Sequence, residues 1–312
     1  EAFVGTWHLL DIGLSQAYYE NTPTQYYYSH EAIAKSILKQ RTKFSHKGTF
    51  GHLLLMAGSY GKIGAAVLAA KAALRAGVGL LTVAVPKCGY EIMQISVPEA
   101  MCQADSQADR LTHLPELGAY NAIAIGPGIS QSEETLNMLK LLLQESRVPI
   151  VFDADALNLL SKNQNLLPQI PENSILTPHP KEFERLAGKS ANNFFRLGKL
   201  QAFSQKYNCY IVLKGAHSAI ACPDGSVYFN STGNNGMATA GSGDALTGIV
   251  ASLHAQGYSP KDALILCVYF HGLAGDLAVQ QTSAPALIAS DIIQYIGKAY
   301  MALFQKGNKP FP

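Results

Sequence analysis

The stretch NNGMATAGSGDALTGIVASL, residues 234–253, joins a glycine-rich turn to the start of an apolar helix. Gly241, Ser242 and Gly243 lead directly into Asp244. Backbone N–H groups in such a loop and in the first turn of a helix attract anions, and phosphate suits them well. Because a carboxylate beside a bound phosphate repels it, Asp244 is predicted to be a general base that takes a proton from an acceptor hydroxyl. The alternative is an N-cap that stabilises its own helix by about 1 kcal/mol.

Apolar runs alternate with helical segments along most of the chain and predict one α/β domain. Continuous apolar strands of this kind belong to a mostly parallel sheet that is covered on both faces, and ligands bind at the carboxyl ends of its strands. A hairpin over 218–230 is expected around a Pro-Asp-Gly turn. The expected strands are 52–58, 79–86, 121–128, 149–155, 174–178 and 209–215, and the expected helices are 30–41, 65–77, 132–146, 243–257, 260–280 and 286–303.

Composition excludes several classes of protein. The 312 residues are 48% apolar and 15% charged, which suits a folded chain with a sizeable core. The formal charge is +2 without a long basic run, so no nucleic-acid partner is expected, and no stretch reaches the roughly 18 consecutive apolar residues of a membrane span. Five scattered cysteines without metal-ligand spacing indicate reduced thiols and a cytoplasmic protein.

The first 30 residues are polar and tyrosine-rich, and we expect them to form a tail or linker before a single domain over 31–312. Because the chain opens on Glu1 rather than Met, it is interpreted as a piece of a longer polypeptide. The domain carries further glycine-rich turns at strand ends, in GSYGKIGAAVLAA (58–70) and in GPG (126–128). Each of these turns is by itself compatible with an ordinary tight turn or with the wall of a ligand site.

Polar residues at three predicted strand ends are candidates for chemistry. Asp153 and Asp155 serve either Mg²⁺ or the acceptor, or cap a helix over 156–162, with Asp155 favoured as the cap. His179 lies between two prolines that restrict the backbone, which favours a substrate contact over a structural role. Lys214 either neutralises a nucleotide phosphate or is an ordinary edge lysine, and His271 is expected to be packed in the core.

Six motifs occur in the order typical of one protein family, and they cover about residues 40–305. They are MAGSYGKIGAA, GPG, DADALN, TPHPKEFERL, LKGAHS and GNNGMATAGSGDALTG. Together they resemble the ADP/ATP-dependent NAD(P)H-hydrate dehydratases of the ribokinase-like superfamily, which implies a three-layer α/β/α domain with a small β-hairpin. The chain departs from the usual family pattern at Asn235 (for Pro), Ser242 (for Thr) and Lys181 (for Gly).

The resemblance implies a lyase, an ADP-dependent (S)-NAD(P)H-hydrate dehydratase for metabolite repair. It would phosphorylate the ring hydroxyl of hydrated NADH or NADPH (NADHX, NADPHX) and eliminate phosphate, with Mg²⁺ and with ADP or ATP as the donor. By motif, the hydrate contacts are Ala57, Gly128, His179 and Asp244, with Asp244 as catalytic base. The nucleotide contacts are Lys214, Gly215, Ala216, His217, Ser218 and Gly243. No metal ligands are assigned.

The resemblance also bears on assembly. Relatives of this kind are often homotetramers, and GTWHLLDIGL (5–14) resembles the last strand of a preceding hydrate-epimerase domain. That apparent fusion favours ADP as the donor. Two other readings stay open. A vitamin-precursor kinase of the same superfamily would use the same loop and base but release a stable phosphoester, and a silent nucleotide-binding module would not need Asp244.

Overall fold

The computed structural model describes residue 10 and residues 12–304, and its centre is a sheet in the order β1-β10-β9-β8-β7-β6-β5-β2-β3-β4. Only β9 runs antiparallel to its neighbours, so the expected mostly parallel sheet with one hairpin is confirmed. The strands are β1 (Tyr26–Ser29), β2 (His52–Met56), β3 (Leu80–Val85), β4 (Met101–Ala104), β5 (Ala122–Ile125), β6 (Ile150–Phe152), β7 (Ile175–Leu176), β8 (Tyr210–Leu213), β9 (Ala219–Ala221) and β10 (Val227–Asn230).

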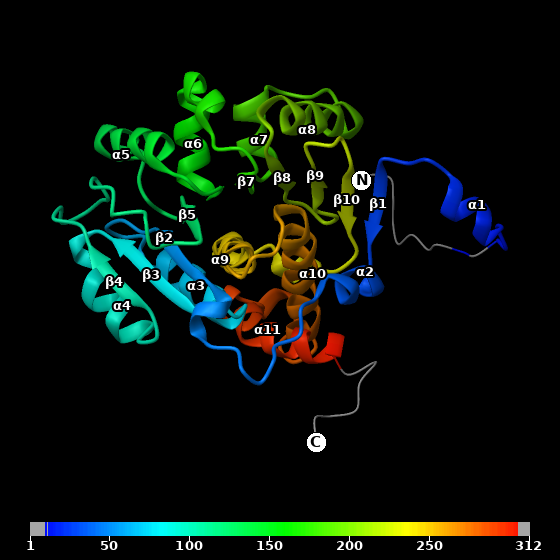
Figure 1. The fold of residues 1–312 in the computed structure, drawn as a ribbon, viewed down its shortest axis with the longest axis horizontal. Helices are drawn as coiled ribbons and strands as arrows, with labels where there is room; N and C mark the ends of the chain where they lie inside the picture. Colours follow the sequence, from blue (N-terminus) through cyan, green and yellow to red (C-terminus); the bar gives the residue numbers. More distant parts are fainter. Residues whose placement is uncertain (1–9, 11, 305–312) are drawn as a thin grey trace.

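Helices cover both faces of the sheet, which confirms the three-layer architecture (Figure 1). Successive strand residues alternate between two separate apolar cores, as in Leu53 and Leu54 of β2, because side chains along a strand point to opposite faces. One core includes α3 (Ile63–Arg75), α9 (Ser242–Ala255), α10 (Pro260–Val279) and α11 (Ala289–Phe304), with α2 (Glu31–Ile37) and α4 (Tyr90–Ser96) at its margin. The other includes α5 (Glu133–Glu145), α6 (Ala154–Lys162), α7 (Pro180–Ala187) and α8 (Asn193–Tyr207).

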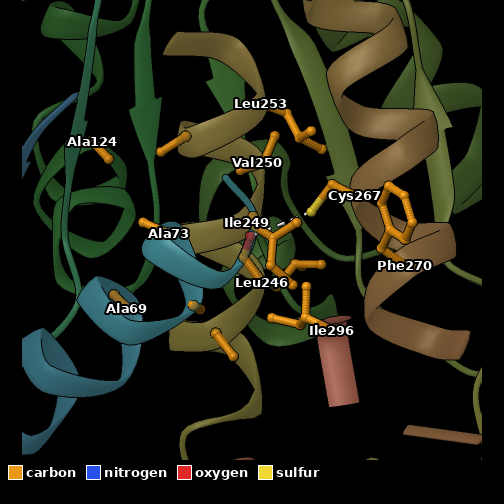
Figure 2. Packing of buried hydrophobic residues seen from close by; sticks show 14 of the residues in the cluster. Ala69, Ala73, Ala124, Leu246, Ile249, Val250, Leu253, Cys267, Phe270 and Ile296 are labelled. Atoms are coloured by element: carbon orange, nitrogen blue, oxygen red, sulfur yellow. Dashed lines mark hydrogen bonds between the residues drawn. The ribbon is translucent and has the colours of Figure 1, made fainter. Parts of the chain in front are cut away.

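The helix that begins at the glycine-rich loop, α9, lies in the middle of its layer. Figure 2 shows Ala69 and Ala73 of α3 on one side of α9 and Cys267 and Phe270 of α10 on the other. The approach of α3 is close because Gly248 has no side chain: a Cβ there would lie 2.1 Å from the backbone oxygen of Ala69. Small residues at this crossing therefore fix where α9 begins relative to the sheet.

Helix α10 is long and apolar enough, by length and composition, to cross a membrane. However, 67% of its apolar window is buried inside the fold, where it packs against α9 and α11. It is the one such helix within the described residues. Its apolar character is accounted for by its place in the core.

The amino-terminal part differs from the expected tail. Tyr26–Ser29 form β1, an edge strand parallel to β10, and the ring of Tyr27 stacks on Tyr228 at 4.8 Å between centroids. A short helix, α1 (Gln16–Asn21), precedes it. Residues 26–29 thus extend the sheet of the domain. Most of the strand expected over 5–14 lies outside the described residues, and 10 and 12–14 are not in a strand.

We expect Gly248→Ala to lower the free energy of unfolding by about 1–3 kcal/mol, because the new methyl group must push α3 away from α9. The matched control is Gly297→Ala in α11, where a Cβ meets nothing within 4 Å; it should stabilise the protein by about 0.5–1 kcal/mol through helix propensity. Urea unfolding measures both. Equal stability of the Gly248→Ala variant and the parent would show that the crossing is not tightly packed.

Candidate functional site

A buried carboxylate joins the ends of three strands to α9. Asp153, only 1% exposed, follows β6, and its side chain accepts hydrogen bonds through both oxygens. Its Oδ1 accepts from Thr177 Oγ1 at 2.8 Å, after β7, and from Lys214 Nζ at 2.7 Å, after β8. Its Oδ2 accepts from Thr247 Oγ1, in α9, at 2.7 Å. The buried charge is therefore both paired and hydrogen-bonded, as burial requires.

The structure corrects the expected role of Asp155 as the helix cap. Asp153 stands at the N-cap position of α6, which begins at Ala154, although its side chain makes no capping bond. Asp155 lies in the first turn, and its carboxylate accepts from Ser130 N and Gln131 Nε2. The two-residue spacing could not show which aspartate stands at the N-cap, because the two differ in the strand or loop that each side chain contacts.

The first turn of α9 has the character of an anion site. Gly241 occupies the N-cap position and offers no side chain, and within the described chain the N–H groups of Gly243 and Asp244 have no acceptor. A Cβ at position 243 would lie 3.2 Å from Lys214 Nζ, so glycine lets this ammonium group come close to the helix start. Two free N–H groups, the helix dipole and a lysine thus converge where a phosphate would bind.

Asp244 lies in the same turn, and its side chain is free to accept a proton. It is half-buried, and no described residue donates a hydrogen bond to its carboxylate. Burial, followed by the negative charge of Asp153, raises the pKa of Asp244 to about 6, although Lys214 opposes this shift. A carboxylate with this pKa is ionised at neutral pH yet more basic than an ordinary aspartate, which is the property a general base needs.

His271 was expected to be an ordinary core histidine, but the structure places it beside the glycine-rich loop. Its Nε2 lies 3.3 Å from Ser242 Oγ, the first residue of α9. Burial lowers the pKa of His271 to about 4, so the ring is neutral at physiological pH. A neutral ring can orient the Ser242 hydroxyl without adding a positive charge to the site.

His179 caps α7 and points one ring nitrogen inward. Its Nδ1 accepts from the N–H groups of Lys181 (3.2 Å) and Glu182 (3.3 Å), while Glu182 Oε2 accepts from His179 N at 2.8 Å. This capping box puts the proton of the neutral ring on Nε2, an assignment that follows from the hydrogen bonds. The side chain is 46% exposed, and its Nε2 lies 3.4 Å from Glu182 Oε1, so a ligand that accepts from Nε2–H would compete with this carboxylate. The backbone N–H of Lys214 donates to Pro178 O at 3.0 Å, so the backbone of His179 lies close in space to that of Lys214.

The two other predicted hydrate contacts lie where β2 and β5 end. Gly58 N donates to Pro127 O at 2.8 Å, and Ser59 Oγ donates to Gly128 O at 2.7 Å, so the two loops are joined. Gly128 is partly exposed and can meet a ligand. Ala57 has no exposed surface, so its assignment as a contact stays a prediction that would require its backbone or a local opening.

Five of the six predicted nucleotide contacts, all except Gly243, lie in one loop between β8 and β9. Gly215, Ala216 and His217 are exposed, and Ser218 is half-buried. His217 Nδ1 lies 3.2 Å from Asn230 O, which ties the loop to the end of β10. Because Lys214 begins this loop and also approaches Gly243, the structure brings the predicted nucleotide residues to one side of the site.

Sequence reasoning missed Thr177 and Thr247, which both donate to Asp153. Thr247 stands one helical turn after Gly243, and this spacing was the available signal. The described residues contain no cluster of three acidic, histidine or cysteine side chains that could hold a metal. Mg²⁺ fits this site as an ion carried mainly by the phosphates of a nucleotide, the usual mode for magnesium in phosphoryl transfer.

Comparison with known proteins shows consistent similarity. The sequence profile described as NAD(P)H-hydrate dehydratase matches residues 53–298. A bifunctional NAD(P)H-hydrate repair enzyme (Nnr) of Moorella thermoacetica is 40% identical over 95% of this chain and 58% of its own length. The chain spans less than two thirds of the length of the first curated relatives it matches.

Solved structures agree with the sequence comparison. The crystal structure of the ADP/ATP-dependent NAD(P)H-hydrate dehydratase from Bacillus subtilis, co-crystallised with ATP/Mg²⁺, superposes with a TM-score of 0.77 at 32% identity, covering 89% of this chain and 98% of that one. A ribokinase-like superfamily protein of Enterococcus faecalis gives a TM-score of 0.79 at 26% identity, covering 91% and 98%. The ribokinase-like fold expected from the sequence is thereby confirmed.

We expect Asp153→Asn to lower the pKa of Asp244 below its parent value of about 6, because a neighbouring negative charge is lost and Lys214 is released. Titration of ¹³Cγ-labelled aspartates by NMR measures this shift, and the resonance that disappears in Asp244→Asn gives the assignment. An unchanged or higher midpoint in Asp153→Asn would contradict the electrostatic link between the two carboxylates.

Proposed function

Because the chain belongs to the NAD(P)H-hydrate dehydratase family, we propose that it is a lyase that restores hydrated NADH and NADPH to NADH and NADPH, with ADP or ATP as phosphoryl donor. The observation that carries the proposal is Asp244. It is a carboxylate without a hydrogen-bond partner in the described chain, with a raised pKa, in the same helical turn as two unpaired N–H groups and close to Lys214. This arrangement suits the removal of a proton beside a phosphoryl group.

Phosphorylation solves the chemical difficulty of the reaction, since hydroxide is a poor leaving group and phosphate a good one. The ring hydroxyl gives its proton to Asp244, and its oxygen bonds to the terminal phosphorus of ADP while the bond from that phosphorus to AMP breaks. The lone pair of the ring nitrogen then breaks the C–O bond and expels phosphate. Loss of a proton from the neighbouring ring carbon forms the missing double bond. The sum is hydrate plus ADP giving NAD(P)H, AMP, phosphate and a proton.

Different residues of the chain have different roles in this reaction. The N–H groups of Gly243 and Asp244, with the Lys214 ammonium, stabilise the charge on the phosphoryl group in transit. The exposed loop from Gly215 supports the nucleotide, and the His179 Nε2–H donates a hydrogen bond to the hydrate. When bound with the nucleotide, Mg²⁺ would supply neutralisation of phosphate charge.

The proposal also covers the domain organisation, cellular location and oligomeric state of the protein. We propose that the dehydratase domain, which includes β1, follows an epimerase domain and prefers ADP as the donor, and the bifunctional name of the Moorella thermoacetica relative supports a two-domain protein. All five cysteines are free, which supports a reducing, cytoplasmic location. The resemblance supports a homotetramer, and light scattering on the purified chain tests it.

The test is the absorbance at 340 nm of a mixture of this protein, hydrated NADH, Mg²⁺ and either ADP or ATP, with a control that lacks nucleotide. We expect a rise that depends on the nucleotide, and the faster donor is the preferred one. A flat trace despite measurable nucleotide binding would overturn the proposal. A phosphorylated product without released phosphate would assign the chain to the small-molecule kinases instead.

We expect Asp244→Asn to keep nucleotide affinity but to lose at least about 10²-fold in turnover, because the general base is absent. Asp224→Asn is the matched control, since Asp224 lies in the exposed hairpin turn between β9 and β10 and should leave turnover unchanged. In the parent enzyme, kcat should fall as pH drops through about 6, where Asp244 becomes protonated. Turnover of Asp244→Asn near that of the parent would remove the residue from this role.

Two substitutions separate the capping and binding roles of His179. His179→Ala should lower thermal stability, since the cap of α7 is lost, and should raise the KM for the hydrate but not for ADP. Asparagine is a good N-cap without an imidazole, so His179→Asn should restore stability while the KM for the hydrate stays high. If His179→Asn has the KM of the parent, the histidine only caps the helix.

A further inference from the structure

A lysine outside the assigned contacts covers Gly128 at the predicted hydrate end of the site. Lys62 precedes α3, and a Cβ at position 128 would lie 3.0 Å from Lys62 Cβ and 3.2 Å from its carbonyl oxygen. The Lys62 ammonium reaches Asp155 Oδ2 at 3.3 Å, beside the loop that follows Gly128. A positive charge therefore stands next to one of the predicted hydrate contacts and belongs to neither the glycine-rich loop nor the nucleotide loop.

The carboxylate of Asp155 binds Lys62, but it also accepts hydrogen bonds from other residues. The carboxylate of Asp155 is nearly buried, and it already accepts from Gln131 Nε2 at 2.7 Å and Ser130 N at 3.2 Å. The Lys62 side chain is 56% exposed, and its contact with Asp155 is the longest of the three. Exposed ion pairs of this kind add little to stability, so stability alone is a weak reason for this pair. The geometry leaves the ammonium group tethered in place and open to a ligand.

The reaction brings two polyanionic molecules to one site, and each needs its own positive charge. Lys214 stands at the start of the predicted nucleotide loop and approaches Gly243, so in the proposed function it serves the phosphoryl donor. NADH carries a bridging pair of phosphates, and NADPH carries a further phosphate on its ribose. Lys162 adds a second cation near Lys62, since its Nζ donates to Gln131 Oε1 at 2.8 Å. The hydrate end thus has the charge that a dinucleotide requires.

We propose that Lys62, tethered by Asp155 beside Gly128, binds a phosphate group of the hydrated dinucleotide. This inference rests on the proposed function, because it takes the hydrate as the ligand of the Gly128 end of the site. Lys62 acts as a specificity-determining residue and takes no part in the proton transfer. Asp155 is a positioning residue, since its proposed effect on the dinucleotide passes through Lys62.

The test compares Lys62→Ala and Lys62→Arg with Lys140→Ala, a matched lysine on α5 whose Nζ bonds to Asn137. Lys62→Ala should raise the KM for NADHX or NADPHX about tenfold, the usual effect of losing a charge-assisted hydrogen bond, with the KM for ADP unchanged. Lys62→Arg should restore most of the affinity, and Lys140→Ala should match the parent.

The choice of hydrate identifies the phosphate. An equal rise in KM for both hydrates places Lys62 on the bridging phosphates, and a rise for NADPHX alone places it on the ribose phosphate; either result supports the inference. An unchanged KM for both hydrates, or a rise in the KM for ADP instead, would overturn it.

A second measurement separates this inference from the proposed function. Binding of the stable products NADH and NADPH, followed by their fluorescence, requires no turnover. If the parent binds these products and Lys62→Ala binds them several-fold more weakly, the inference stands even where the 340 nm assay fails. If the parent binds neither product, or if the variant binds them as well as the parent, Lys62 has no role in dinucleotide recognition.

Discussion

The site depends on one buried carboxylate, that of Asp153. Its hydrogen bonds from Thr177, Lys214 and Thr247 join the ends of β6, β7 and β8 to α9. The same charge has two electrostatic effects on the neighbouring helix start. It binds the Lys214 ammonium, and it adds to the effect of burial on Asp244, so that the pKa of Asp244 is raised to about 6 although Lys214 opposes the shift. The carboxylate that joins the strands to the helix therefore also influences the basicity of Asp244, the proposed general base.

Packing beneath the site is the second constraint. Helix α9 can start at the carboxyl edge of the sheet only because α3 approaches it through Gly248 and a row of alanines. The crossing fixes the first turn of α9, and with it the unpaired N–H groups of Gly243 and Asp244. On the other side, α10 contributes His271, which stays neutral and contacts Ser242. Stability and chemistry are therefore coupled through a helix that is almost entirely buried.

Short-range sequence patterns were sufficient to predict the central part of the fold. The buried parallel strands, the hairpin and α9 were expected from apolar runs and turn residues. The edge strands β1 and β4 were not expected, because their largely exposed residues lack the continuous apolar pattern of the central strands. Long-range hydrogen bonds were equally invisible: nothing within DADALN shows that Asp153 binds Lys214 while Asp155 binds Lys62.

The central claim is that the ring hydroxyl itself attacks phosphorus after Asp244 removes its proton. Hydrated NADH prepared in H₂¹⁸O carries the isotope in that hydroxyl, and ³¹P NMR of the released phosphate reveals where the oxygen goes. We predict one ¹⁸O in each phosphate that is formed with NADH. Unlabelled phosphate, with the isotope recovered in water, would mean that nucleotide hydrolysis and dehydration are separate events, and it would contradict the account.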